Sequence, residues 1–171
     1  MKNSKTLFIT QAAIIAALYV VLTLLANALG LANYAIQLRF SEALTILPFF
    51  LPAAIPGLFL GCLISNLLTG AIIWDVVFGS LATLLGAVGT YLLRRVKWLA
   101  PLPPIIANTI IVPLVLYFAY RIPGSIPYFM LTVGIGEILS CGVLGMLLLF
   151  VLQKYKKYIF PAAAKPESPQ Q

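Results

Sequence analysis

One carboxylate in this 171-residue chain stands where charge is otherwise avoided. Glu137 lies in the stretch LTVGIGEILSCGVLG, and its nearest charged neighbours along the chain are Arg121 and Lys154. A carboxylate at the centre of a membrane-spanning helix costs about 2.5–3.5 kcal/mol on insertion scales, so such a side chain faces a cavity or a partner. Glu137 is therefore predicted to contribute to a site for a ligand or an ion.

Two further acidic residues have local alternatives to a binding role. Glu42 follows Arg39 by three residues, and the two side chains can pair if the turn between them is helical. Asp75 directly precedes an apolar run that begins at Val76, where a carboxylate is suited to cap a helix. Glu42, Asp75 and Arg39 remain candidate binding residues because the expected topology places them in the same half of the molecule as Glu137.

Amides, a hydroxyl and aromatic rings complete the candidate site. Asn66 and Asn108 lie within apolar runs, and Ser140 follows Glu137 by three residues, on roughly the same helical face. Three aromatic residues are expected at the outer membrane boundary, where anchoring at the interface is the usual role and stacking on a flat ligand is the alternative. They are Trp74, Tyr34 and Tyr128.

The sequence lacks the motifs of several functional classes. It contains no histidine, which removes His-based catalytic triads and HExxH zinc sites. No Walker motif or glycine-rich nucleotide fingerprint is present, so we expect no ATPase activity, no catalytic residue, no metal and no cofactor in this chain. Cys62 and Cys141 lie inside apolar runs without CxxC spacing, which favours packing over a disulfide or a metal pair.

The composition indicates a helical membrane protein with several spans. Hydrophobic residues make up 62% of the chain, the mean hydropathy is +1.06, and there are only 11 basic and 4 acidic residues. A soluble domain is usually about a quarter charged. The net charge of +7 comes from basic residues at segment ends, so we expect no nucleic-acid binding. Four runs are long enough to cross a bilayer: Leu7–Leu29, Val76–Leu93, Leu102–Tyr120 and Ile126–Leu152.

The uncharged stretch Ala43–Trp74 fits neither one crossing nor two full crossings. As one helix it would be about 48 Å long, whereas two crossings need about 40 residues. Three prolines break the stretch near its middle: Pro48, Pro52 and Pro56. We predict two short or tilted helices joined by PAAIP, and a re-entrant loop is the alternative. Residues 1–157 then form a single all-α domain, a compact bundle of six transmembrane helices whose second and third are short and proline-broken.

Six segments place both termini on one side of the membrane. That side would hold nine of the eleven basic residues and the other side only Arg39 and Arg121, so the positive-inside rule makes the termini cytoplasmic. Residues 158–171 are expected to be a disordered cytoplasmic tail, which carries the fourth acidic residue, Glu167. The small residues at 26–28 resemble a signal cleavage site, but the preceding apolar run is longer than usual for a signal peptide. An uncleaved first helix is favoured, with cleavage as the alternative.

Small residues recur at helical spacing in several segments. In lipid such stripes let helix backbones approach closely. We expect most of them to pack inside this chain, although the alanine face of the first helix is equally suited to a partner helix. That face comprises Ala12, Ala13, Ala16 and Ala17.

Two stretches carry a resemblance to a known family. Residues 36–70, IQLRFSEALTILPFFLPAAIPGLFLGCLISNLLTG, and residues 74–87, WDVVFGSLATLLGA, resemble the QueT family, the substrate-binding (S) components of energy-coupling-factor transporters for queuosine precursors. The resemblance implies a six-helix fold in the bacterial cell membrane and a site that opens outward. It also implies a transmembrane coupling protein and two cytoplasmic ATPases as partners. The alanine-rich face of the first helix resembles the surface that docks the coupling protein.

The implied substrates are 7-deazaguanines such as preQ1, preQ0 or queuine. One carboxylate, for which we favour Glu137, can accept the adjacent N–H and amino groups of their guanine-like edge. Asn66 or Asn108 can donate to the ring carbonyl, Trp74 or a tyrosine can stack on the ring, and Asp75 or Glu42 can meet an aminomethyl cation. The sequence leaves open which precursor is bound and whether the ATPase module is shared.

Two alternatives differ from this hypothesis. One is an S component for another planar, vitamin-like substrate, and the other is a small structural or channel-forming membrane protein whose acidic residues line an ion path. A path would continue polar groups toward the cytoplasm, whereas the inner halves of the predicted segments contain almost none. This distribution favours a closed pocket over a pore.

Overall fold

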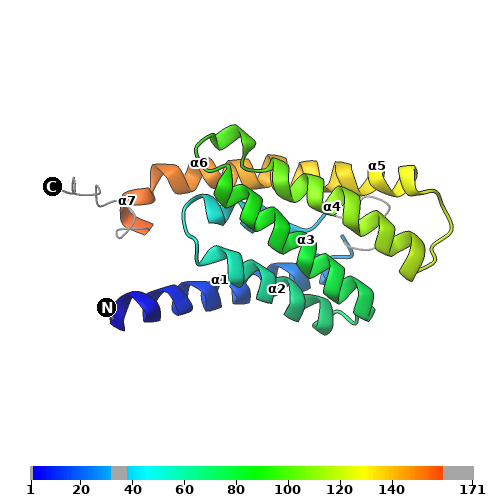
Figure 1. The fold of residues 1–171 in the computed structure, drawn as a ribbon, viewed down its shortest axis with the longest axis horizontal. Coiled ribbons are helices and arrows are strands. Elements are labelled where there is room, and N and C mark those ends of the chain that lie inside the picture. Colours follow the sequence, from blue (N-terminus) through cyan, green and yellow to red (C-terminus); the bar gives the residue numbers. More distant parts are fainter. Residues whose placement is uncertain (1, 32–37, 160–171) are drawn as a thin grey trace.

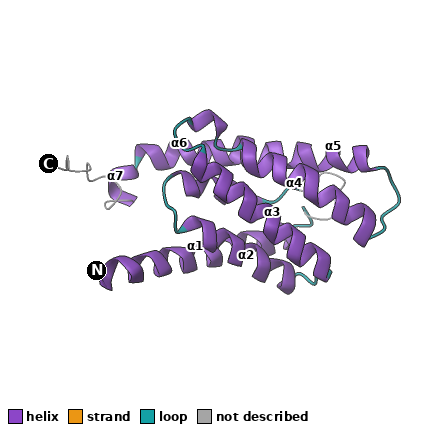
Figure 2. Cartoon of the chain, in the orientation of Figure 1, coloured by secondary structure: helices purple, strands orange, loops and turns teal. Residues whose placement is uncertain are grey.

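The computed structural model describes residues 2–31 and 38–159, and every regular element in this part of the chain is helical (Figure 2). In chain order these elements are α1 (Lys2–Ala28), η1 (Phe40–Phe49), α2 (Ala54–Leu68), α3 (Ile73–Leu92), η2 (Lys97–Leu99), α4 (Leu102–Leu114), η3 (Val115–Ala119), α5 (Ile126–Glu137), η4 (Ile138–Gly145), α6 (Met146–Lys154) and α7 (Lys156–Ile159).

Four helical stretches are long and apolar enough to cross a membrane. They are Ser4–Ala28, Ile73–Leu92, Lys97–Ala119 and Ile126–Lys154, and they match the four runs predicted from the sequence. The two apolar helices between the first and second of these are shorter, with 10 residues in η1 and 15 in α2. The all-helical class is thus confirmed, whereas six crossings and cytoplasmic termini remain predictions. The predicted disordered tail lies almost wholly outside the described residues.

The proline-rich segment forms the short pair of helices. Pro48 lies inside η1, a 3-10 helix, and the backbone N–H of Leu51 then donates to Leu47 O at 3.0 Å. The chain reverses at Pro52, and α2 runs back beside η1. This reversal lies toward the end of the molecule where α1 begins and α6 ends (Figure 1).

Left-handed glycines end both α1 and α2. Gly30 and Gly70 each have φ of 74°, a conformation that glycine adopts without steric cost. After Gly70, the backbone N–H of Ala71 donates to Asn66 O at 3.0 Å, which closes the last turn of α2. The tight turn leads directly into α3, so Asn66 Nδ2 lies 3.4 Å from the backbone oxygen of Asp75.

Close packing of α1 on α2 uses glycine on one helix and alanine on the other. A Cβ added to Gly57 would lie 2.7 Å from Ala12 O, and one added to Gly61 would lie 3.0 Å from Ala16 O. Two members of the predicted alanine stripe therefore pack inside the chain. The two exposed members are Ala13 and Ala17.

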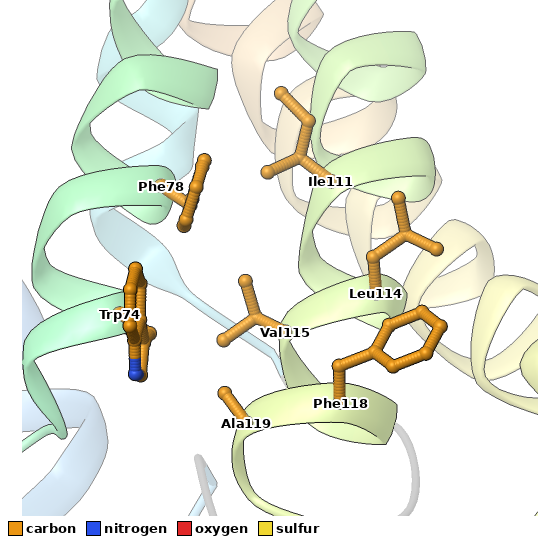
Figure 3. Close-up of a pocket in the computed structure, with 7 residues that line it drawn as sticks. All are labelled: Trp74, Phe78, Ile111, Leu114, Val115, Phe118 and Ala119. Atoms are coloured by element: carbon orange, nitrogen blue, oxygen red, sulfur yellow. The ribbon is translucent and has the colours of Figure 1, made fainter.

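The contact between α3 and α4 is tight at one end and open at the other. Near the loop that carries Arg94, Arg95 and Lys97, a Cβ added to Gly86 would lie 2.7 Å from Pro104 Cα. Toward the other end, Pro113 removes a backbone donor from α4, and the wider π-helical turns of η3 follow. The two helices leave a groove of about 610 Å³ between them there (Figure 3).

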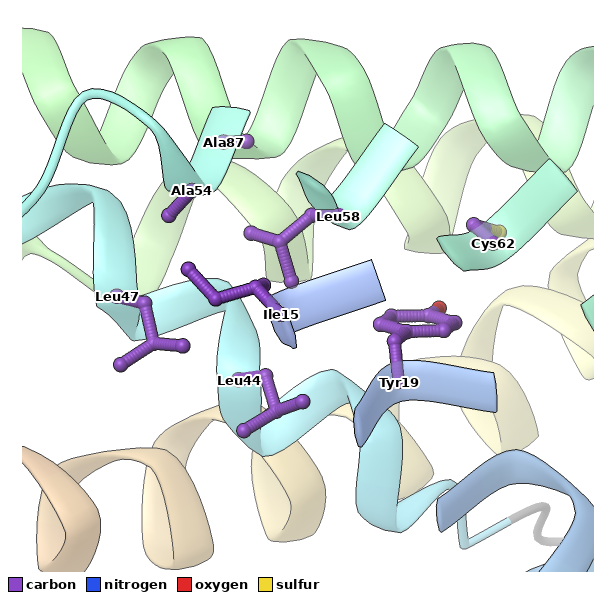
Figure 4. Packing of buried hydrophobic residues seen from close by; sticks show 8 residues of the cluster. All are labelled: Ile15, Tyr19, Leu44, Leu47, Ala54, Leu58, Cys62 and Ala87. Atoms are coloured by element: carbon purple, nitrogen blue, oxygen red, sulfur yellow. The ribbon is translucent and has the colours of Figure 1, made fainter. Parts of the chain in front are cut away.

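An apolar core joins α1, η1, α2 and α3 (Figure 4). Its buried members are Ile15, Tyr19, Leu44, Leu47, Ala54, Leu58, Cys62 and Ala87. A second buried cluster ties η1 to α6 and to the loop before α4 through Ile46, Phe50, Ala100 and Leu149. Because apolar contacts hold η1 on two sides, the polar side chains of its first turn have fixed positions.

Candidate ligand-binding site

Two helices of unusual type pack against each other at the centre of the molecule. The 3-10 helix η1 has 10 residues, although 3-10 runs beyond about three or four residues are uncommon. Its neighbour η4 is a π-helix of 8 residues, a geometry frequent at functional sites. Glu42 lies in the first turn of η1 and Glu137 directly precedes η4. The contact between the two helices therefore brings two carboxylates together.

Glu42 is fully buried and is held by donors from several elements. The Tyr19 hydroxyl of α1 donates to its Oε1, and Asn108 Nδ2 of α4 donates to its Oε2 at 3.4 Å. The Thr45 hydroxyl donates to the backbone oxygen of Glu42 at 2.6 Å. Both carboxylate oxygens thus have protein partners, and Glu42 links α1, η1 and α4.

Glu137 is also buried, with 5% of its surface exposed, and its carboxylate lies beside the Cys141 thiol and the Asn108 amide. Cys141 Sγ, one turn later, donates to Glu137 Oε2 at 3.2 Å. A thiol is a weak donor, and a carboxylate has about four acceptor positions. Glu137 therefore keeps acceptor capacity for a ligand that carries N–H groups.

The two carboxylates lie close enough to influence each other. Ligand atoms of Glu42, Glu137 and Cys141 lie within 4.8 Å of one another, near enough to hold a divalent cation, although internal hydrogen bonds engage all three side chains. Like charges at this distance repel, and the repulsion grows in a medium less polar than water. A cationic ligand or one rich in N–H donors would relieve that repulsion.

A second layer of polar groups lies next to the carboxylates. Arg39 is half-buried, and its Nη2 donates to Asn66 Oδ1 at 3.1 Å. The backbone N–H of Arg39 donates to the Ser140 hydroxyl oxygen at 3.2 Å. Arg39 therefore joins the start of η1 to α2 and η4. It also borders a small hollow of about 60 Å³, lined further by Thr23, Ala26, Asn27 and Thr69.

The structure brings most of the predicted site residues together. The assembled side chains are Glu42, Glu137, Asn66, Asn108, Arg39 and Ser140, and the backbone of Asp75 joins them through Asn66. The two local alternatives do not describe what is found. The Arg39 guanidinium bonds Asn66 while the Glu42 carboxylate bonds Tyr19 and Asn108, and Asp75 lies in the first turn of α3, after the capping position at Ile72.

Two of the three predicted aromatic residues, Trp74 and Tyr128, do not join this cluster. Trp74 is 57% exposed and lines the groove between α3 and α4, where its ring stacks on Phe78 with centroids 6.1 Å apart. Tyr128 is half-exposed near the start of α5. The third predicted residue, Tyr34, lies outside the described part of the chain.

Sequence reasoning missed three side chains that shape the site: Tyr19, Thr45 and Cys141. Thr45 and Cys141 lie 3.4 Å apart, oxygen to sulfur, beside the two carboxylates. The spacing of Cys141, four residues after Glu137, would have placed the thiol next to the carboxylate. Tyr19 continues the stripe of Ala12 and Ala16 on the buried face of α1, and this periodicity is the signal that marks it as inward-facing.

Two hydrogen bonds of Tyr120 join the end of η3 to the start of α3 beside the site. The Tyr120 hydroxyl donates to Asp75 Oδ2 at 3.1 Å and accepts from the Ile72 backbone N–H at 3.4 Å. Burial and the neighbouring Asp75 carboxylate raise the pKa of Tyr120 above its usual 10.0. The phenol therefore remains a donor at neutral pH.

Tyr120→Phe is expected to lower the free energy of unfolding by about 1 kcal/mol, the usual net contribution of one hydrogen bond. A raised folded-state pKa contributes stability below pH 10.0 that is lost as pH rises through the folded value. The difference between wild type and variant should therefore be constant from neutral pH to about pH 9 and shrink above pH 10. Thermal unfolding of both proteins across this pH range measures the difference. A difference that grows with pH would contradict a stabilising hydrogen bond from the Tyr120 hydroxyl.

Comparison with known proteins identifies the family of the chain. The QueT transporter family matches residues 9–154. A curated relative, the queuosine precursor transporter QueT of Lactococcus lactis subsp. cremoris (strain MG1363), is 41% identical over 98 residues, which cover 57% of this chain and 57% of the relative. The alignment thus spans a little over half of that relative's length, and no solved structure matches the chain. Since the family match covers most of the helical bundle and four helices are long enough to span a bilayer, the chain is a multi-pass membrane protein that belongs to the QueT transporter family.

Proposed function

We propose that this chain is the substrate-binding membrane subunit of an ATP-driven energy-coupling-factor importer, and that it captures a queuosine precursor of the 7-deazaguanine class from outside the cell. The observation that carries the proposal is the buried pair of carboxylates, Glu42 and Glu137, surrounded by amide and hydroxyl groups in a chain of the QueT transporter family. Support for the substrate class comes from the curated relative, whose name is queuosine precursor transporter.

The chemistry of the cluster suits a guanine-like edge. Glu137 accepts the ring N–H and the adjacent amino group, since its carboxylate keeps acceptor positions that its protein partners do not fill. Asn108 or Asn66 donates to the ring carbonyl, and Glu42 stabilises an aminomethyl cation where the substrate has one. Arg39 stands between this cluster and the small hollow. Because a hollow of about 60 Å³ is far below the roughly 300–1,000 Å³ of ligand pockets, binding requires the Arg39 side chain to move.

The distribution of polar groups supports capture followed by release rather than a pore. Beyond the carboxylates, the core along η1 becomes apolar at Leu44 and Leu47, which pack on α1 and α2 (Figure 4). No polar path therefore continues from the cluster along η1 within the described residues. Release to the other side then needs the bundle to be reoriented, which is the work of the ATP-driven partners in this proposal.

Partners and orientation follow from the remaining surface. The sequence carries no nucleotide-binding motif, so a coupling protein and two ATPases supply the energy. Ala13 and Ala17 are exposed on α1 and available for the coupling protein, while Ala12 and Ala16 pack against α2. The end of the bundle with the start of α1 and the end of α6 carries Lys5, Arg94, Arg95, Lys97 and Lys154, and we place it in the cytoplasm of a bacterial cell.

Calorimetric titration of the purified protein alone, in detergent, tests the proposal. The ligands are the aminomethyl and nitrile 7-deazaguanines, queuine, guanine and one unrelated vitamin. We expect tight binding of at least one deazaguanine and none of the vitamin. Thr90→Val is the control for variants of the site, since Thr90 is as buried as Glu42 but donates to Ala100 O at 2.8 Å, away from the cluster. We expect this control to bind as the wild type does. Failure of a folded sample to bind any deazaguanine would remove the substrate claim.

A further inference from the structure

The groove between α3 and η3 is an apolar surface that the function proposed above does not use. Its lining is Trp74, Phe78, Ile111, Leu114, Val115 and Ala119, together with Phe118. Trp74, Phe78 and Phe118 are all more than 40% exposed, so the groove opens on the outside of the bundle. Its volume of about 610 Å³ lies within the range of ligand sites.

The groove runs along the helices and is nearly as long as a lipid acyl chain in one leaflet. It extends from Ala119 to Ile111 along the second helix wall, which is about 12 Å at 1.5 Å per residue, against about 15 Å for half of the hydrocarbon core. The indole nitrogen of Trp74 points toward the end marked by Ala119, while Phe78 and Ile111 lie at the other end (Figure 3). Tryptophan is enriched at membrane interfaces, with its polar end toward water.

A cation stands at the interfacial end of the groove. Arg121 lies two residues beyond the span Lys97–Ala119 and is exposed, and its side chain has no ion-pair partner among the described residues. It borders a second hollow of about 510 Å³, which adjoins the groove at Phe118. The nearby carboxylate of Asp75 is turned toward Tyr120 and Gly79.

We propose that an anionic phospholipid binds at this place, with one acyl chain in the groove and its phosphate beside Arg121. The membrane surrounds these helices with acyl chains, and a chain in the groove supplies the dispersion contacts that its lining otherwise lacks. Charge decides the headgroup, because an exposed arginine at the membrane surface attracts the phosphate of an anionic lipid. The inference is independent of the proposed substrate and holds or fails without it.

Tryptophan quenching by brominated lipids tests the site. The chain has two tryptophans, so Trp98→Phe leaves Trp74 as the reporter. The protein is placed in phosphatidylcholine nanodiscs that contain increasing fractions of either brominated phosphatidylglycerol or brominated phosphatidylcholine. We expect the phosphatidylglycerol probe to quench Trp74 at a several-fold lower fraction than the phosphatidylcholine probe. Equal quenching by the two probes would overturn the anionic site, because acyl chains would then reach Trp74 regardless of their headgroup.

Three further variants in the Trp98→Phe background separate the two parts of the site. Arg121→Gln is expected to remove the preference for phosphatidylglycerol, whereas Arg95→Gln, which removes one positive charge at the opposite end of α3, is expected to leave it unchanged. Ala119→Phe fills the groove and should reduce quenching by both probes. An equal loss of preference in Arg95→Gln would make the effect one of net charge, and unchanged quenching in Ala119→Phe would place the acyl chain elsewhere. Either result overturns the proposal.

Discussion

Glu137→Gln is expected to lower the affinity for a 7-deazaguanine by about 100-fold or more, with no loss of thermal stability in the empty protein. Hydrogen bonds to a charged group contribute about 1.5–3 kcal/mol each, and each 1.4 kcal/mol is a factor of ten in affinity. The amide offers one acceptor where the carboxylate offered two, and its NH2 opposes the amino group of the ligand. Glutamine keeps one oxygen that can accept from the Cys141 thiol, so the empty fold loses no hydrogen bond at this place. Calorimetric titration and thermal unfolding measure the two effects.

Glu42→Gln is the informative comparison for this variant. Both oxygens of Glu42 already accept hydrogen bonds, from Tyr19 and Asn108, so replacing one oxygen by NH2 leaves either the Tyr19 O–H or the Asn108 amide without its present acceptor. An unsatisfied buried group costs about 1–3 kcal/mol, and stability should therefore fall together with affinity. Glu137→Gln changes binding alone in this scheme, and Glu42→Gln changes both. If Glu137→Gln keeps wild-type affinity, Glu137 does not hold the ligand edge.

The helical fold could be predicted because lipid demands a simple pattern. Each long span needs about 20 apolar residues, and four such runs are visible in the sequence and present in the structure. The types of the other helices could not be read in this way. The spacing of apolar residues does not distinguish the 3-10 turns of η1 or the π turns of η4 from an α-helix. Packing between the two helices decides their winding.

The site could be predicted where charge stands out against apolar surroundings. Glu137, Asn66 and Asn108 were found because a polar group inside a membrane-spanning apolar run is costly unless it faces a partner or a cavity. Tyr19 and Cys141 were missed because tyrosine and cysteine are common in buried apolar segments. Only their contacts with Glu42 and Glu137 show that they belong to the candidate site. Trp74 was predicted as a candidate site residue from its place in the chain, but the winding of α3 directs its side chain into the groove between α3 and α4.

The position of Tyr19 makes the site depend on how closely α1 approaches α2. Its hydroxyl donates to Glu42, and its Cβ would lie 2.7 Å from a Cβ added to Gly61. Gly61→Ala therefore forces α1 away from α2 or turns the Tyr19 ring, because neither a Cβ atom nor the Ala16 carbonyl oxygen can swing aside. Overpacking of this kind costs about 1–3 kcal/mol. We expect a lower melting temperature and, because Glu42 loses its donor, weaker binding of the deazaguanine.

Gly142→Ala supplies a control with the same chemical change. A Cβ at Gly142 would meet only Ile138 Cγ2 at 3.7 Å and Ile105 Cδ1 at 3.9 Å, which are ordinary contacts. Alanine is favoured over glycine in a helix interior by about 0.5–1 kcal/mol, so this variant should melt at the wild-type temperature or above. The two substitutions are thus expected to differ in the direction of their effect, measured by thermal unfolding followed by circular dichroism. If both shift the melting temperature equally, the close approach of α1 to α2 does not limit stability, and Tyr19 has room to hold Glu42 without glycine at position 61.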